Sequence, residues 1–305
     1  MITGTIKMSY HESVLSKESI DGLDVKPDGI YVDVTFGGGG HSKEILKKLE
    51  TGRLVAFDQD EDVLKNALKD ERFTLVNANF RFLKNFLMYY KALPVDGIIA
   101  DLGISSHQID DPDRGFSTRF DSELDLRMDR KGKLDAKDIL NDYSSEEISA
   151  LFFKYGEMQN AKRLANAIVR YRKDKKIHTV PDLKNAIGKF AKKGKENKFY
   201  AKVFQALRIE INNEMDSLKD MLLQSKEVLN PGGKLVVISY HSLEDRLVKN
   251  FMKAGNFEGI VEKDFYGNEI TPFKMITRKP IVPGQDELDR NKRSRSAKLR
   301  IAIKN

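Results

Sequence analysis

Residues 32–42 read VDVTFGGGGHS, a stretch in which a strand runs directly into four glycines and then into a helix. Glycine lets a backbone turn sharply and approach a ligand because no Cβ stands in the way, and a helix N-terminus offers unpaired N–H donors. Asp58 ends the next apolar run, residues 53–58, where a carboxylate can accept hydrogen bonds from both hydroxyls of a ribose. These features favour a nucleotide-type site over a purely structural glycine turn.

The pattern around this loop predicts an α/β fold with a doubly wound sheet. Near-continuous apolar runs alternate with helical segments, as expected of buried parallel strands. The expected strands are residues 29–35, 53–58, 73–76, 95–101 and 234–240, the last after an NPGG turn at 230–233, and the expected helices of this part are 42–49 and 61–68. Residues 273–277 and 298–303 are expected to form an antiparallel pair at the sheet edge.

The alternation stops between residues 111 and 208, where only amphipathic helical segments occur, such as 145–153, 160–172 and 180–190. About 100 residues are too many for a loop, so this stretch is expected to form a small all-helical domain inserted into the sheet domain. We therefore expect one domain from residues 8–110 and 209–305, and an inserted substrate- or RNA-binding domain from residues 111–208.

The glycine loop departs from the dinucleotide fingerprint G-x-G-x-x-G, because Ser42 stands at the position of the third glycine. That glycine serves close packing beside a pyrophosphate. S-adenosylmethionine has no phosphate and carries a sulfonium cation, which needs nearby acids. Asp33, Asp58 and Asp101 each lie at or near the end of an expected strand, and Lys43 is the nearest base. This balance favours S-adenosylmethionine as the cofactor.

The positive charges are concentrated in two segments. Residues 160–202 carry fourteen Lys and Arg against three acids, and residues 290–305 carry seven bases and no acid, in a chain of net charge +7. Basic clusters on an otherwise acidic protein are typical of a polyanion site, although a lysine-rich solvated helix face is the alternative for the first segment. We expect both segments to hold RNA phosphates, so binding should weaken steeply with salt.

The composition limits the other kinds of chemistry. There are no cysteines, and the five histidines lack metal-ligand spacing, so neither a disulfide nor a protein-bound metal is expected. The first ten residues contain no apolar core of a signal peptide, and no apolar run approaches the length of a membrane-spanning helix. We expect a soluble, cytoplasmic protein with no membrane partner.

Seven motifs, in this order and spacing, resemble the bacterial 16S ribosomal RNA (cytosine N4)-methyltransferases. They are TFGGGGHS (35–42), AFDQD (56–60), DLGISSHQIDDPDRGFS (101–117), LDLRMD (124–129), FQALRIEINNE (204–214), ISYHSLEDRLVK (238–249) and RSRSAKLRIA (293–302). The match extends from about residue 10 to residue 303, and only residues 1–7 look extraneous to it.

The resemblance implies a class I, Rossmann-like methyltransferase core with an inserted helical domain. It also implies S-adenosylmethionine as cofactor and a decoding-centre cytidine of the small ribosomal subunit as target. The cofactor contacts that it implies are Gly39, Gly40, His41, Asp58 at the ribose, Phe80 near the adenine, Asp101 and Gln108. Two departures are noted: relatives often place a larger residue second in the GGGG loop, and many have proline where His107 stands.

Asp101 is our candidate for the catalytic residue, because the cytosine amine needs a hydrogen-bond acceptor that aligns its nitrogen with the sulfonium methyl. DNA amino-methyltransferases usually have an (Asp/Asn)-Pro-Pro-aromatic loop here, whereas this chain has Asp-Leu-Gly-Ile. Phe116, or Tyr240 with His241, could replace the missing aromatic ring that stacks on the base. Arg208 and Glu210 are expected to brace the domain junction rather than to touch RNA.

Two other functions remain open at this point. One is a DNA or small-molecule amine methyltransferase on the same core, and the other is a non-catalytic RNA-binding or assembly factor with a vestigial cofactor pocket. The sequence leaves open whether free RNA or an assembled subunit is the substrate. It also leaves open whether the chain forms a homodimer.

Overall fold

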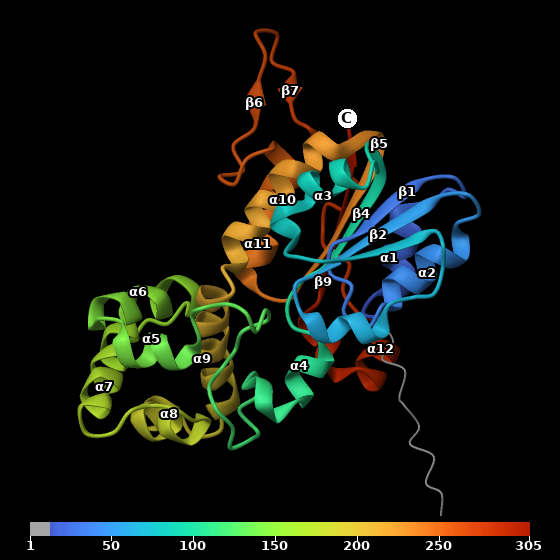
Figure 1. Cartoon of the computed structure of the whole chain (residues 1–305). Coiled ribbons are helices and arrows are strands. Elements are labelled where there is room, and N and C mark those ends of the chain that lie inside the picture. Colours follow the sequence, from blue (N-terminus) through green and yellow to red (C-terminus); the bar gives the residue numbers. More distant parts are fainter. Residues whose placement is uncertain (1–12) are drawn as a thin grey trace, which may run out of the picture. The chain divides into compact units, whose positions relative to one another are not determined.

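The computed structural model describes residues 13–305 in two compact units (Figure 1). The first, here called the sheet unit, contains residues up to Gly103 and from Lys219 onward. The second, the helical unit, is Ile104–Leu218. The expected boundaries, 110/111 and 208/209, lie within ten residues of these. His11 and the extraneous-looking residues 1–7 lie outside the described residues.

The sheet unit is built on a seven-stranded sheet of order β3-β2-β1-β4-β5-β9-β8. Its strands are β1 (Ile30–Asp33), β2 (Arg53–Asp58), β3 (Phe73–Asn77), β4 (Val95–Asp101), β5 (Leu229–Ser239), β8 (Phe273–Met275) and β9 (Lys298–Lys304). The first five strands are parallel, and β9 is antiparallel to both β5 and β8. The chain reverses its direction of winding between β1 and β4, and ligands of open α/β sheets bind at such a point, beyond the carboxyl ends of the strands.

The helices of this unit cover both faces of the sheet (Figure 1). They are α1 (Ser16–Leu23), α2 (Gly40–Lys48), α3 (Leu83–Tyr89), α10 (Glu214–Val228), which begins in the helical unit, α11 (Ser242–Ala254) and α12 (Gln285–Arg290). Helix α1 packs on α2 and on β4, β5 and β9, while α11 packs on β5, β8 and β9. Short 3₁₀ segments η1 (Glu61–Asn66), η2 (Phe80–Phe82) and η5 (Lys292–Ser296) complete the connections.

The helical unit contains α4 (Ser106–Asp110), η3 (Pro112–Arg114), α5 (Ala136–Asp142), α6 (Ser145–Gly156), α7 (Ala161–Asp174), α8 (Val180–Ile187), η4 (Gly188–Phe190) and α9 (Glu196–Ile211). Its own apolar core includes Ile148, Phe152 and Leu164, which are all fully buried. Within this unit, whose residues are all described, the only extended pairing is an isolated bridge between Glu123 and Thr179. The amphipathic pattern of residues 145–190 therefore reports helices, as expected.

Three of the sequence motifs, residues 101–117, 124–129 and 204–214, are held together by hydrogen bonds of polar side chains. The guanidinium of Arg114, 1% exposed, donates to the carbonyl oxygens of Arg127 (3.0 Å) and Met128 (2.9 Å). The side chain of Asn212 accepts from Met128 N–H (2.7 Å) and donates to Leu126 O (2.8 Å). These side chains replace a regular ladder, since buried backbone groups must find partners.

Three local features differ from the predicted elements. The helix expected over residues 61–68 is a 3₁₀ helix over residues 61–66, and Ala67 after it has left the helical conformation (φ −51°, ψ 133°). The NPGG segment lies inside the span of β5, where the pairing with β4 shifts register between Val95 and Gly97. A small hairpin of β6 (Glu262–Lys263) and β7 (Glu269–Ile270), visible at the top of Figure 1, has no counterpart in the predicted elements.

Candidate active site

The glycine loop connects β1 to α2 and is shaped by positions where only glycine fits. Gly39 has φ +73°, and a Cβ there would lie 2.8 Å from the Phe36 ring. A Cβ on Gly40, the first residue of α2, would lie 1.8 Å from Ser13 Oγ. The N–H of Gly39 donates to Phe36 O (2.7 Å), which closes the turn. The loop thus leads tightly into the helix N-terminus, with bare backbone at both residues.

Gly38, the second glycine of the loop, is different. A Cβ there would meet nothing within 4 Å, and its φ is not in the left-handed region. The structure therefore has room for a larger residue at this loop position.

Asp58 is the last residue of β2, the strand beside β1, and its carboxylate supports the loop. Oδ2 accepts from Gly37 N–H (2.8 Å), and Oδ1 accepts from Asp60 N–H (2.9 Å). Each carboxylate oxygen has a second lone pair, so both can still accept from a ribose hydroxyl. Burial raises the pKa of Asp58 to about 6, against the effect of the two backbone N–H groups.

Asp33, at the end of β1, is buried and accepts hydrogen bonds from residues on both sides of the glycines. It accepts from Ser42 Oγ (2.7 Å) and from Thr35 N–H (3.1 Å), and so joins the strand to both ends of the loop. Burial raises the pKa of this carboxyl above its usual value. Ser42, which replaces the third glycine of the dinucleotide fingerprint, thus has a structural role of its own.

Asp101 ends β4, on the other side of β1. Its N–H donates to Thr35 Oγ1 (2.6 Å), and its Oδ1 accepts from the Tyr240 hydroxyl (2.8 Å). Its Oδ2 lies 3.9 Å from Nδ1 of His41. Burial raises the pKa of Asp101 to about 6, while His41 and the Tyr240 hydroxyl lower it. Asp101 remains ionised at neutral pH and is tied to three segments.

His41 lies in the first turn of α2 with its imidazole buried, 4% exposed. Nε2 is 3.1 Å from Val14 O, so the ring lies between that carbonyl and Asp101. Its side chain therefore faces the carboxylate network, and a contact between His41 and the cofactor stays a prediction.

Phe80 begins η2, which follows β3 beyond the carboxyl end of that strand, and it is half-buried. The preceding Asn79 donates from Nδ2 to Gln59 Oε1 (2.7 Å) and caps η2 by accepting from Arg81 N–H (2.9 Å). The segments that follow β2 and β3 are therefore bonded to each other. This link between the AFDQD segment (56–60) and the NANF segment (77–80) was not anticipated from the sequence.

Gln108 belongs to the helical unit, where it is 5% exposed and forms a capping box with Ser105 at the start of α4. Its N–H donates to Ser105 Oγ (3.2 Å), and its Oε1 accepts from Ser105 N–H (3.1 Å). Both of these hydrogen bonds are local to the start of α4, and a contact between Gln108 and the cofactor stays a prediction.

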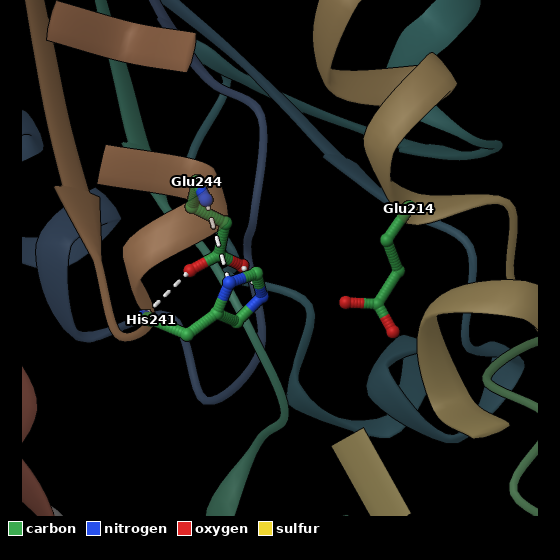
Figure 2. A group of neighbouring side chains, drawn as sticks. All are labelled: Glu214, His241 and Glu244. Atoms are coloured by element: carbon green, nitrogen blue, oxygen red, sulfur yellow. Dashed lines mark hydrogen bonds and ion pairs between the residues drawn. The ribbon is translucent and has the colours of Figure 1, made fainter. Parts of the chain in front are cut away.

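The segment after β5 supplies two groups that the sequence had suggested as base-holding residues. Tyr240 bonds to Asp101, as described above. His241 caps α11: Glu244 N–H donates to Nδ1 of His241 (3.3 Å), and a Glu244 carboxylate oxygen lies 3.1 Å from Nε2 (Figure 2). Glu244, 3% exposed, also accepts from the N–H groups of Tyr240 (2.9 Å) and His241 (3.2 Å). The side chain of His241 thus caps the start of α11 and contacts Glu244.

Phe116, the other suggested ring, is 7% exposed and packs in the core of the helical unit. Its ring lies 5.9 Å from the guanidinium carbon of Arg114. The suggestion that Phe116 stacks on the target base is therefore wrong for this conformation, because the core already occupies the ring.

Arg208 forms a two-pronged ion pair with Glu214, from Nε (2.8 Å) and from Nη2 (3.0 Å), and Glu210 accepts from the Tyr143 hydroxyl (3.4 Å). All four residues belong to the helical unit. These contacts lie within the helical unit, and a role of Arg208 and Glu210 at the domain junction stays a prediction.

The basic segments differ in how their charges are used. In residues 160–202 most of the Lys and Arg side chains are exposed, including Lys192, Lys193 and Lys195. In residues 290–305, Arg300 is 4% exposed and its Nε donates to Asp245 (2.6 Å), and Lys298 Nζ pairs with the same carboxylate (3.3 Å). The expectation that the whole C-terminal segment holds phosphates is wrong for these two residues, because they are part of β9 and pair with α11.

The sheet order, the glycine loop and the acids at the ends of β1, β2 and β4 together define a class I, Rossmann-like methyltransferase core. The chain belongs to the MraW methylase family, which it matches over residues 8–305.

Curated relatives of nearly the same length agree with this assignment. The chain is 58% identical over 301 residues to the ribosomal RNA small subunit methyltransferase H of Flavobacterium johnsoniae, covering 98% of this chain and 99% of that one. It is 57% identical over 297 residues to the protein of the same name from Parabacteroides distasonis, covering 97% of each. An rRNA methylase structure from Streptococcus thermophilus aligns at 10% identity with a TM-score of 0.43, over 97% of this chain and 99% of that one. Among residues 13–305, no helix is long and apolar enough to cross a membrane.

Proposed function

We propose that this protein transfers a methyl group from S-adenosylmethionine to the exocyclic N4 amine of a cytidine in 16S ribosomal RNA, in the decoding centre of the small subunit. The observation that carries the proposal is the match along the whole chain to small-subunit rRNA methyltransferases. The glycine loop and the carboxylates at the ends of β1, β2 and β4 supply the matching chemistry.

The charges of the site suit a sulfonium cofactor. Burial is the main cause of the raised pKa values of Asp58 and Asp101, and the negative charge of Asp33 raises both further. A bound cation would relieve this repulsion, whereas a pyrophosphate would increase it. When bound, the cofactor supplies an electrophilic methyl group. Gly39 and Gly40 would lie against it with bare backbone, Asp58 would accept from its ribose, and Phe80 would contact its adenine.

Asp101 would be the catalytic acceptor. The cytosine amine is a weak nucleophile because its lone pair is delocalised into the ring. A carboxylate that accepts a hydrogen bond from N4–H localises that lone pair and directs it at the methyl group, and such positioning contributes several kcal/mol without a strong base. With a pKa of about 6, Asp101 is ionised at neutral pH and can accept this bond.

The helical unit would hold the RNA backbone. Its segment 160–202 presents exposed Lys and Arg side chains, and proteins that act on a base must hold the flanking phosphates while the base leaves the stack. Of the C-terminal segment, the exposed Lys292 and Arg295 of η5 remain candidates for phosphate contacts.

The decisive experiment is transfer of labelled methyl groups to small subunits and to free 16S RNA, both from cells that lack the enzyme, followed by nucleoside analysis. We expect label in N4-methylcytidine, and comparison of the two substrates decides which one is used. No incorporation into either would favour the non-catalytic assembly factor, and label in another nucleoside would refute the proposed target.

The role of Asp101 has its own test. We expect Asp101→Asn to reduce turnover at least about 100-fold, which is a larger effect than its weakening of S-adenosylmethionine binding, because the interaction with the target amine acts in the transition state. Near-normal turnover with cofactor binding intact would remove Asp101 as the essential acceptor. A cytoplasmic location and a homodimer belong to the same proposal, and light scattering after size-exclusion chromatography tests the second.

A further inference from the structure

Tyr240 and Asp101 meet although 139 positions separate them in the chain. Their strands, β4 and β5, are parallel neighbours with Asp101 opposite Ile238, so Tyr240 follows β5 just beyond the carboxyl end of β4. The Tyr240 hydroxyl donates to Asp101 Oδ1 at 2.8 Å. The Tyr240 ring packs beside Gly103, where a Cβ would lie 3.4 Å from it and where φ is +102°.

Tyr240 is itself held in place. Its N–H donates to Glu244 Oε2 (2.9 Å), and Glu244 is buried in the first turn of α11 (Figure 2). Burial and the neighbouring Asp101 raise the pKa of the Tyr240 hydroxyl, which therefore stays protonated and can only act as a donor toward a carboxylate. The direction of this hydrogen bond is thus settled.

The second oxygen of Asp101 has different surroundings. Oδ2 lies 3.9 Å from Nδ1 of His41, beyond hydrogen-bonding distance, and the His41 ring is anchored at its other nitrogen by Val14 O (3.1 Å). Asp101 keeps some exposure, with 23% of its side chain accessible. One carboxylate oxygen is therefore engaged by a fixed donor, while the other retains lone pairs for an incoming group.

We infer that Tyr240 is a positioning residue: its hydroxyl occupies Oδ1 of Asp101 and so directs Oδ2 toward the amine of the target base. This inference rests on the proposed function of Asp101. It assigns the hydroxyl of Tyr240 a task, whereas stacking on the base would need only the ring.

Tyr240→Phe separates these two tasks, because it keeps the ring and removes the hydroxyl. A hydrogen bond to a carboxylate stabilises the ionised form, so its loss should raise the pKa of Asp101 above about 6. Since the ionised form is the acceptor, the acidic limb of the kcat profile should move to higher pH, by about one unit. At pH 7 a one-unit shift lowers the ionised fraction of Asp101 about twofold. With the lost alignment of Oδ2 added, we expect kcat to fall about 10-fold, with the KM for S-adenosylmethionine within about twofold.

Tyr31→Phe is the matched control. It removes another tyrosine hydroxyl from the sheet unit, on a side chain that is 1% exposed; this hydroxyl accepts from Lys26 N–H (2.7 Å) and donates to Asp24 O (3.4 Å). This variant should lose stability and leave the acidic limb unchanged. Fluorotyrosine placed at position 240 gives a second reading: its hydroxyl is a stronger donor, so the limb should move to lower pH.

The outcomes are distinct. The positioning role is overturned if Tyr240→Phe leaves both kcat and the acidic limb of its pH profile unchanged. If the Phe variant does not fold, the role is overturned when fluorotyrosine at position 240 does not move the acidic limb. Wild-type protein that labels no cytidine refutes the proposed function instead. An active Asp101→Asn variant refutes the role of Asp101, and the inference about Tyr240 falls with it.

Discussion

At the residue scale, the site shows what a sequence can and cannot reveal. Asp58 and Asp101 were predictable because each ends an apolar run, and the ends of parallel strands meet at one edge of a sheet. The bond between Tyr240 and Asp101 was not predictable, because it depends on the side-by-side pairing of β4 and β5. Phe116 was misjudged for a related reason: its ring is as suitable for a core as for a base, and only the tertiary structure decides.

The ionised carboxylate of Asp101 is needed for the proposed activity, but we expect it to lower the stability of the fold. Its pKa is about 6 in the folded protein against 3.8 for an ordinary Asp, so ionisation is costlier in the folded state than in the unfolded state. This cost is absent below about pH 4, grows up to about pH 6 and is constant above. Asp101→Asn removes it and still accepts from Tyr240, so the free energy of unfolding at pH 8 should rise by about 1–3 kcal/mol.

Denaturant unfolding at pH 8 and at pH 4 measures this effect. The gain should be present at pH 8 and disappear at pH 4, where wild-type Asp101 is also neutral. Asp21→Asn, at an exposed position of α1, should leave stability unchanged at both. A less stable Asp101→Asn protein at pH 8 would show that ionised Asp101 stabilises the fold.

At the element scale, most strands of the sheet were predicted well. The bounds of β2 and β4 agree with the apolar runs, and β8 pairs antiparallel with β9 as expected, since β-branched and aliphatic runs between turn residues report buried strands. The β6–β7 hairpin escaped prediction because its strands are two residues long and exposed. Residues 61–66 showed helical spacing, which does not distinguish a short 3₁₀ helix from an α-helix.

The glycine loop predicts opposite effects at adjacent positions. Gly39→Ala places a Cβ in a left-handed conformation and 2.8 Å from the Phe36 ring, so we expect a loss of about 1–2 kcal/mol in stability and at least tenfold weaker cofactor binding. Gly38→Ala meets open space and should retain stability. Thermal unfolding and titration calorimetry with S-adenosylmethionine test both, and equal behaviour of the two variants would contradict this description of the loop.

The segment before α9 predicts how salt affects RNA binding. Lys192, Lys193 and Lys195 are exposed, and replacing all three by Gln should weaken binding uniformly across RNA sequences. The slope of log K against log salt should become shallower by about 2 to 3, because each phosphate contact releases about one counterion. Replacing Lys17, Lys47 and Lys48 of the sheet unit removes the same charge and serves as the control. Equal slopes in the two variants would remove this segment from the RNA site.

At the scale of the whole molecule, the sheet unit is discontinuous in sequence, since Ile104–Leu218 separates β4 from β5. The two strands are nevertheless direct neighbours in the sheet. The core of the helical unit is formed by residues within one continuous segment. The molecule therefore combines one unit of local contacts with another whose central pairing spans the entire insertion.

This arrangement sets an order of events during synthesis. The ribosome releases β1 to β4 first, but their neighbour β5 emerges only after the whole helical unit, and β9 comes last. Local contacts form sooner than distant ones, so the helical unit should be folded while the sheet still has an open edge at β4. We consider stalled nascent chains whose residues up to 218 have all emerged from the ribosome. These chains should resist limited proteolysis within residues 104–218 and be cleaved within residues 13–103. Uniform cleavage of both segments would refute this order. While the edge of β4 is still unpaired, the nascent chain most needs protection from aggregation.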